Sequence, residues 1–199
     1  MLADNKTPPV YLGLVHHPVY NKTGDVITTS VTNMDLHDIS RTCRTFGIKR
    51  YFIVTPIVHQ HDLLENILGY WETDSANCYN PDRHDALSLI KVSNDIEMMI
   101  AEIEKEEGVP PFVAVTSAKE FQKCTMDFFP IIQKMRLDRR PLLLLFGTGH
   151  GLTEEVIENA DFFVKPIVGV ANDSYNHLSV RSAVAIYCDR MSLSLEGVQ

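Results

Sequence analysis

Apolar and polar positions along the chain follow two periods, which alternate from one end of the sequence to the other. Short apolar runs predict buried strands, whereas apolar residues recurring every three or four positions predict helices packed on one side. The expected strands are Val10–Val15, Tyr51–Val54, Leu87–Val92, Phe112–Val115, Leu142–Phe146 and the shorter Phe162–Lys165. Because several of these runs are apolar throughout, as parallel strands covered on both faces are, the alternation predicts an α/β fold.

The helix with the clearest ends is expected between Asn94 and Glu107, where the apolar residues share one face. Asn94 and Glu97 have the spacing of a capping box, and Gly108 closes the helix. Further helices are expected at Met34–Phe46, His59–Trp71, Asp127–Leu137, Glu154–Asn159 and Leu178–Ser192.

Length and composition describe one ordinary soluble domain. The chain has 199 residues, of which 45% are apolar and 22% charged, so it can bury a sizeable core. We expect residues 10–193 to form this domain, with a loose arm over residues 1–9 and a loose tail over residues 194–199. The apolar runs are far shorter than the roughly 20 residues that span a bilayer, and residues 1–9 are polar, so we expect a cytoplasmic protein without a membrane segment.

The cysteines and histidines show no metal-binding pattern. His59 and His61 are followed by Asp62 but by no further ligand at metal-binding spacing. The cysteines lie far apart without a CxxC pair, which disfavours a zinc site or a disulfide framework and predicts reduced, mostly buried thiols at Cys43, Cys78, Cys124 and Cys188. We therefore expect no metal.

The formal net charge of −8 argues against a protein that grips nucleic acid by bulk electrostatics, since that mode sets many cations against phosphates. The charges are unevenly placed: Asn94–Glu107 holds six acids and one base, whereas Arg41–Arg50 holds four bases and no acid. A polyanion would have to meet selected faces, built from Arg41, Arg44, Lys49, Arg50, Lys134, Arg136, Arg139 and Arg140.

The sharpest local signal is Leu142–Leu152, LLLLFGTGHGL, in which a buried strand runs into a turn with three glycines in five residues. Backbone without Cβ atoms lets a ligand approach closely. The segment lacks the spacing of a dinucleotide fingerprint or a P-loop, and Glu154 and Glu155, in the first turn of the helix that Thr153 can cap, oppose a phosphate. A ligand that is neutral or cationic at this loop is one interpretation, and a tight turn with glycines for geometry alone is the other.

A second signal is Lys165–Ala183, KPIVGVANDSYNHLSVRSA, in which a short strand leads through a polar loop of about ten residues into a helix rich in small side chains. Polar loops of this length are often functional. The same residues also suit a helix cap followed by a close contact between helices, so spacing alone leaves both interpretations open.

These two segments together resemble the SPOUT class of S-adenosylmethionine-dependent RNA methyltransferases. The signature of that class is a hydrophobic strand entering a Gly-rich loop, followed by a PI-containing loop that ends in an N-x-L-S-V-x-x-A-like helix start. Phe146–Leu152, and Ile167 with Asn176–Ala183, match this pattern. The resemblance extends over Val10–Met191 and is nearest to a small bacterial group, with the catalytic domain alone, related to the tRNA guanine-N1 methyltransferases.

A third segment, DLHDISRTCRTFG from Asp35 to Gly47, is similar to the first motif of the class. Arg41 and Thr42 fall in register with its Arg-Thr pair, and Gly47 with its terminal glycine. Asp35 stands where the motif has Asn. Three motifs in order make the resemblance fairly specific.

The resemblance implies an open sheet with helices on both faces and a C-terminal part threaded into a trefoil knot. It also implies three loops that hold S-adenosylmethionine, largely by main-chain groups around the adenine, with glycines where Cβ atoms would fill space shared with the ligand. Carried over position by position, the cofactor-binding residues are Thr116, Ser117, Phe146, Gly147, Thr148, Gly149, Gly151, Leu152, Ile167, Asn176, His177, Leu178, Ser179 and Val180.

The resemblance further implies methyl transfer to a base or ribose of tRNA or rRNA by a homodimer. Arg41 matches the motif arginine that positions the acceptor or a phosphate, with a solvated or subunit-interface ion pair as the alternative. Asp173 lies in the region from which the guanine-N1 enzymes draw an acidic base, and an ordinary Asx-turn also fits it. The competing hypothesis is a knot protein that binds the cofactor as a partner or sensor without methylating RNA.

Several polar residues near this expected site have no fixed role. Pro18–Asn33 inserts a polar stretch with a turn expected at Lys22–Asp25, which either reads the substrate or is a hairpin without a function. His16, His17 and His37 either line the acceptor pocket or are ordinary hydrogen-bonded histidines.

Overall fold

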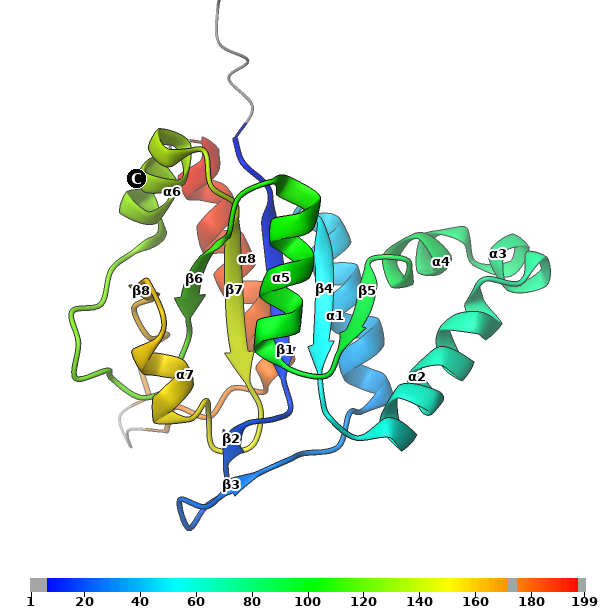
Figure 1. The fold of residues 1–199 in the computed structure, drawn as a ribbon, viewed down its shortest axis with the longest axis horizontal. Coiled ribbons are helices and arrows are strands. Elements are labelled where there is room, and N and C mark those ends of the chain that lie inside the picture. The colour runs from blue at the N-terminus through cyan, green and yellow to red at the C-terminus, as the bar shows by residue number, and fades with distance from the viewer. Residues whose placement is uncertain (1–6, 172–174, 197–199) are drawn as a thin grey trace, which may run out of the picture.

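A six-stranded sheet forms the centre of the computed structural model, which describes residues 7–171 and 175–196 (Figure 1). The strands lie in the order β5-β4-β1-β7-β6-β8, and each neighbouring pair in this order is parallel. Their bounds are Val10–Val15 (β1), Arg50–Val54 (β4), Ile90–Ser93 (β5), Phe112–Val115 (β6), Leu142–Gly147 (β7) and Phe162–Phe163 (β8). The predicted α/β fold with a parallel sheet is confirmed.

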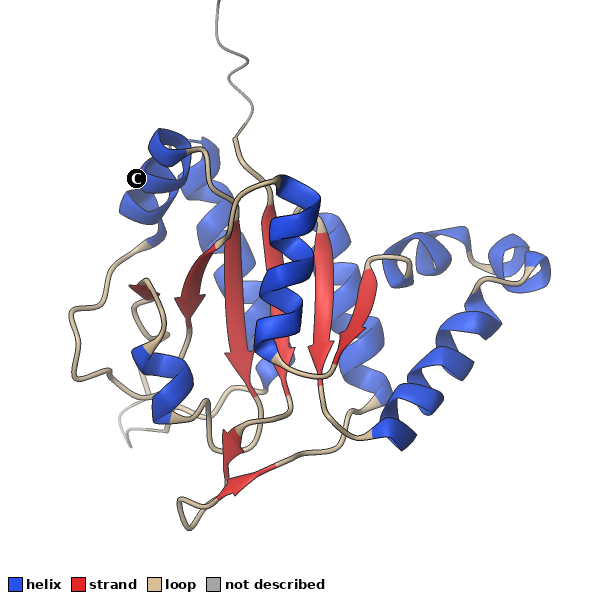
Figure 2. Cartoon of the chain, in the orientation of Figure 1, coloured by secondary structure: helices blue, strands red, loops and turns tan. Residues whose placement is uncertain are grey.

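Helices cover both faces of this sheet (Figure 2). One face is covered by α5 (Ile96–Glu107) and the short α7 (Glu154–Glu158). The opposite face is covered by α1 (Asn33–Thr45), α6 (Phe128–Asp138) and α8 (Val180–Glu196). In the described part of the chain, no helix has the length and hydrophobicity of a membrane span.

The central strand β1 shows how the sequence builds two cores. Successive side chains of a strand point to opposite faces of the sheet. Leu12 and Leu14 therefore pack with the helices α1, α6 and α8, whereas Tyr11 and Val15 pack with α5 on the other side. All four side chains are fully buried, which accounts for the uninterrupted apolar run in the sequence.

The strand predicted over Leu87–Val92 is wrong at its start, since β5 begins only at Ile90. A turn at residues 88 and 89 leads into β5, whereas Leu87 ends the helix α4 (Pro81–Leu87), which the hydrophobic pattern did not predict. Its first turn is capped by Asn80, whose side-chain oxygen accepts a hydrogen bond from the backbone N–H of Arg83 at 3.0 Å. With α2 (Val58–Trp71) and α3 (Asp74–Tyr79), α4 forms a helical arm beside the β5 edge of the sheet (Figure 1).

Two helix ends also differ from the prediction. The cap of α5 is Asp95, which accepts from the backbone N–H of Met98 at 2.7 Å, so the expected capping box starting at Asn94 is wrong. The last helix continues beyond Ser192 to Glu196. There the Arg136 guanidinium donates to the carbonyl of Leu195 at 2.7 Å, which ties this end to α6.

The polar insert folds as the hairpin whose turn was expected at Lys22–Asp25. Its strands, β2 (Val19–Tyr20) and β3 (Val26–Ile27), pair antiparallel. The hairpin is bonded to the Gly-rich loop: Tyr20 donates its N–H to the carbonyl of Gly151 at 2.9 Å, and its own carbonyl accepts from the N–H of His150 at 2.8 Å. The insert thereby becomes part of the carboxyl edge of the sheet.

Candidate active site

A pocket of about 630 Å³ lies at the carboxyl edge of the sheet, where β1, β7 and β6 end and α8 begins. In open α/β sheets, ligands bind in the crevice outside the carboxyl ends of the strands. Segments from four places in the chain line it: the turn after β6, the Gly-rich loop after β7, the loop before α8, and residues of the hairpin insert with the start of α1.

The structure brings the sequence-predicted cofactor residues together around this pocket, with one exception. Residues far apart in the chain, such as Thr116, Gly149 and Ser179, share its lining. Leu152 is the exception, because its side chain is 4% exposed and packs in the core on the α5 side of the sheet. Its backbone forms a bridge to Val19, so it anchors the Gly-rich loop instead of lining the pocket.

The glycines of the loop are required by its own backbone geometry. A Cβ atom at Gly147 would lie 2.6 Å from the backbone nitrogen of Leu152. Gly149 has a φ of +58°, and a Cβ atom there would lie 2.8 Å from the carbonyl oxygen of Tyr20. The turn and the hairpin therefore require these glycines themselves. The resemblance implied instead that the missing Cβ atoms leave room for a ligand.

Side chains of the loop before α8 hold the pocket wall in shape. The Asn176 side chain donates to the carbonyl of Ile167 at 2.8 Å and accepts from the N–H of Gly169 at 3.3 Å. The hydroxyl of Ser179 accepts from the N–H of Ser182 at 3.2 Å and so caps α8. The predicted base Asp173 lies outside the described residues.

One end of the pocket is charged and joins two helices. The guanidinium of Arg181 donates from Nη1 to Oδ1 of Asp35 at 2.9 Å, and its Nε lies 3.4 Å from Oδ2 of Asp38. The hydroxyl of Thr32 donates to the other oxygen of Asp35 at 2.6 Å. Sequence reasoning missed Arg181, which occupies a variable position of the last motif. Asp35 could have indicated such a residue, because a carboxylate in place of the motif Asn is stabilised by a nearby cation.

His16, at the end of β1, lines the same pocket through a chain of hydrogen bonds. Its Nδ1 lies 2.9 Å from the hydroxyl of Thr29, which lies 2.5 Å from the hydroxyl of Thr148 in the Gly-rich loop. Burial lowers the pKa of His16 to about 4, against the opposing attraction of Asp35. His17 instead bonds within the hairpin, to Thr28, and does not line the pocket.

Arg41 lies outside this pocket in its own chain. Its side chain is exposed on α1 and lines a separate cleft between α1 and α4. Arg44 in that cleft pairs with Asp85, with its Nε 2.6 Å from Oδ2 of the carboxylate. The expected acceptor-positioning role of Arg41 therefore requires another chain, and it stays a prediction.

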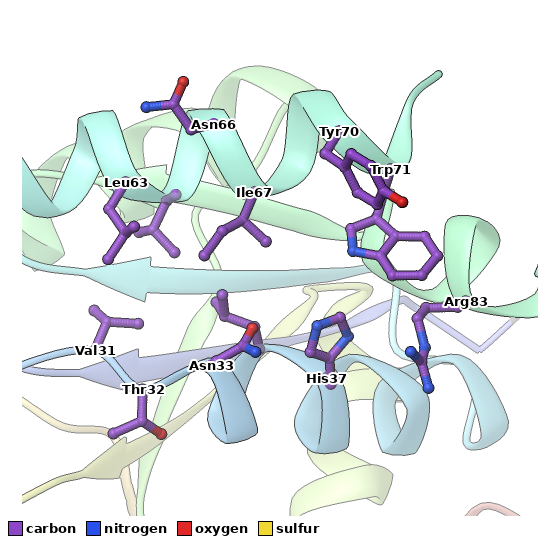
Figure 3. A pocket seen from close by; sticks show the side chains of 12 residues that line it. Val31, Thr32, Asn33, His37, Leu63, Asn66, Ile67, Tyr70, Trp71 and Arg83 are labelled. Carbon is purple, nitrogen blue, oxygen red and sulfur yellow. The ribbon is translucent and has the colours of Figure 1, made fainter. Parts of the chain in front are cut away.

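His37 lines a groove of about 670 Å³ between α1 and α2 (Figure 3). His37 and Trp71 meet there edge to face with their ring centroids 5.9 Å apart, and the guanidinium of Arg83 lies 5.2 Å from the Trp71 ring. Burial lowers the pKa of His37, and the nearby Arg83 acts in the same direction. His37 thus belongs to this groove and not to the pocket at the sheet edge.

The described residues contain no group of three or more His, Cys, Asp or Glu side chains placed to hold a metal ion. All four cysteines are free; Cys43 and Cys188 are buried, whereas Cys78 and Cys124 are exposed, so the expectation of mostly buried thiols is wrong for two of them.

Most of the basic residues expected to meet RNA are already bonded within the chain. Arg44, Lys49 and Lys134 pair with carboxylates. Arg136 and Arg140 donate to backbone carbonyls. Contact of these side chains with a polyanion would have to compete with these intramolecular bonds.

The fold and the pocket define an α/β protein with a ligand site at the carboxyl edge of its sheet, and comparison with known proteins identifies the class. Residues 9–193 match the family model described as SAM-dependent RNA methyltransferase. The chain belongs to this family. An uncharacterized protein from Aquifex aeolicus (strain VF5) is 36% identical over 182 residues, which are 92% of this chain and 87% of that protein.

One relative is named as an enzyme and is longer than this chain. The tRNA (guanine-N(1)-)-methyltransferase of Nitratidesulfovibrio vulgaris (strain Hildenborough) is 41% identical over 182 residues, which are 92% of this chain but 41% of the relative. The chain thus spans about two fifths of the length of that enzyme and of its counterpart in Oleidesulfovibrio alaskensis.

Solved structures share the fold at low sequence identity. The probable methyltransferase from Bordetella pertussis Tohama I superimposes with a TM-score of 0.63 at 16% identity, over 95% of this chain and 97% of that one. The SpoU methyltransferase AviRb from Streptomyces viridochromogenes, in complex with the cofactor AdoMet, gives a TM-score of 0.56 at 15% identity, over 100% of this chain and 63% of that one.

Proposed function

We propose that this protein transfers a methyl group from S-adenosylmethionine to RNA, with tRNA as the substrate class. The observation that carries the proposal is the single pocket around which three separated motif segments meet, together with a polar end built by Asp35 and Arg181. Family membership and the tRNA methyltransferase name of a relative that is 41% identical support it. A tRNA substrate places this work in the cytoplasm.

The residues present suit the cofactor. A volume of about 630 Å³ falls within the range of small-molecule sites. Phe146–Gly151 and Asn176–Val180 would hold it, with Thr116, Ser117 and Ile167 completing the wall. The side chains of Thr116 and Asn176 are bonded to the protein backbone, which suits recognition through main-chain groups. When bound, S-adenosylmethionine supplies a methyl group already activated on a sulfonium.

The task left to the protein is orientation of the acceptor, because the leaving group is already good. Asp35 and Arg181 present a fixed pair of opposite charges at the polar end of the pocket. We include a homodimer in the proposal, since Arg41 can serve the pocket only from a partner chain. Exposed apolar side chains beside the pocket support such a contact: Val168 is 72% exposed and Leu178 47%.

Two measurements on the same preparation test the proposal. Isothermal titration with S-adenosylmethionine reports cofactor binding, and transfer of a labelled methyl group to unmodified tRNA and rRNA transcripts reports the reaction. We expect both, with label in the tRNA pool. Cofactor binding without label in any transcript would favour the alternative of a cofactor-binding partner or sensor, and absence of cofactor binding would refute both.

A further inference from the structure

We infer that His16 holds the acceptor nucleotide: its Nε2 accepts a hydrogen bond from an N–H or O–H group of the base or ribose that is methylated. This inference rests on the proposed methyl transfer to RNA and assigns a role to a residue of the pocket outside the three motifs. The support comes from the hydrogen-bond chain that ends at His16, from its burial, and from its position in the pocket.

We assign the proton of His16 to Nδ1, in an arrangement that the chain of hydroxyls accommodates. The hydroxyl of Thr148 lies 3.0 Å from the carbonyl of Val15, and we take this carbonyl as the acceptor of its hydrogen. In this arrangement Thr29 donates its own hydrogen to Thr148 across their 2.5 Å contact. Nδ1 of His16 is then the donor to Thr29 at 2.9 Å, and Nε2 carries a free lone pair.

That lone pair is buried and has no partner among the described residues. His16 is only 1% exposed. A buried polar atom without a hydrogen bond lowers the stability of the fold. A ligand donor would remove this cost. Burial lowers the pKa of His16 to about 4, which favours a neutral ring and makes it a weak base at physiological pH. His16 is thus a positioning residue and not the group that removes the proton.

The position of His16 favours the acceptor nucleotide over the cofactor as the source of the donor. The motif residues carried over for the cofactor belong to the loops after β6 and β7 and to the loop before α8. His16 and Thr29 come from the end of β1 and the hairpin insert, and Asp35 from the start of α1. His16 is close enough to Asp35 for the carboxylate to affect its pKa, and Asp35 belongs to the charged pair that we propose orients the acceptor.

Two substitutions separate the two nitrogens of the ring. His16→Asn keeps an amide donor near Nδ1 for Thr29 and loses the acceptor at Nε2, whereas His16→Gln places an amide oxygen near Nε2. With unmodified tRNA transcripts, we expect His16→Asn to raise KM for RNA about tenfold while the Kd for S-adenosylmethionine changes less than about twofold, and His16→Gln to restore much of the loss. An unchanged KM in His16→Asn would overturn the inference. A Kd for S-adenosylmethionine that rises in parallel would do so too, by assigning the donor to the cofactor.

A measurement on the wild-type protein is independent of turnover and of the folding of the variants. Nitrogen-15 NMR of the His16 ring should show a protonated Nδ1 and a bare Nε2 at neutral pH, with the Nε2 signal shifting when tRNA is added and not with S-adenosylmethionine alone. A protonated Nε2, or a signal unmoved by tRNA that is being methylated, contradicts the inference. If the wild type methylates no RNA, the proposed function fails, and a protonated Nε2 would overturn the assignment of His16 separately.

Discussion

Arg181 and Asp35 stand 146 positions apart in the sequence, and the guanidinium of the first donates to the carboxylate of the second at 2.9 Å. The bond joins the first turn of α8 to the first turn of α1 at the polar end of the pocket. The Asp35 side chain is 6% exposed and the Arg181 side chain 27%. The pair therefore ties the last motif of the chain to the first in a site largely shielded from water.

Asp35→Asn, which restores the residue of the family motif, should destabilise this protein by about 1–3 kcal/mol. The substitution leaves the Arg181 guanidinium with a neutral partner in a partly desolvated site, and removing one member of such a pair costs more than the pair contributes. Urea unfolding at neutral pH measures the change. Asp38→Asn is the matched control: Asp38 is 53% exposed and 3.4 Å from Nε of Arg181, so its loss should cost less than about 1 kcal/mol. If both substitutions lowered the free energy of unfolding equally, burial of Asp35 would not explain its contribution to stability.

Gly149→Ala should weaken S-adenosylmethionine binding at least about tenfold. The new Cβ has to displace the carbonyl of Tyr20, 2.8 Å away, and with it the junction of the hairpin and the Gly-rich loop. Gly108→Ala provides the control, since Gly108 also has a positive φ, +76°, but open space around the added atom and a place at the end of α5. Both should cost about 1 kcal/mol of stability from backbone strain. Isothermal titration that finds wild-type affinity for Gly149→Ala would refute the role of the junction.

The stability of the protein should fall as the pH is lowered, and His16 should supply a large part of the change. Its pKa is about 4 in the folded protein and 6.5 as the reference for an unfolded chain. The unfolded state binds the proton first, so the stabilisation is fully present above pH 6.5 and is lost as the pH falls toward 4; it amounts to on the order of 3 kcal/mol. Denaturant unfolding between pH 7.5 and pH 4 measures it. In His16→Asn this drop should shrink, and an unaltered slope would show that other groups cause it.

Arg41→Ala should bind S-adenosylmethionine normally and methylate RNA poorly. The reason is that Arg41 lines a cleft of its own chain away from the pocket and can reach an active site only in a partner. Mixing Arg41→Ala with Gly149→Ala chains therefore gives some dimers in which an intact pocket faces an intact Arg41. We expect the mixture to be more active than either variant alone. Activity equal to the average of the two variants would remove Arg41 from a shared site.

The sequence by itself determined most of the strands and helices, and its resemblance to a known class predicted the loops that we propose hold the cofactor. Runs such as Val10–Val15 and Phe112–Val115 have the bounds that the pattern predicted, because burial on both faces of a parallel strand leaves no polar positions within it. Local chemistry also determined the hairpin turn at Lys22–Asp25. It failed for α4, where a cap at Asn80 and a proline start a helix without a clear apolar stripe.

Only the tertiary structure decided which of these segments meet. The order of the strands places the ends of β1, β7 and β6 side by side, and so brings His16, Thr29 and Thr148 into one chain of hydrogen bonds and Arg181 onto Asp35. It also separated Arg41 from the pocket, although Asp35 lies on the same helix. The physical reason is that side-chain spacing within a helix or strand is local, whereas contacts across the sheet depend on how the whole chain packs.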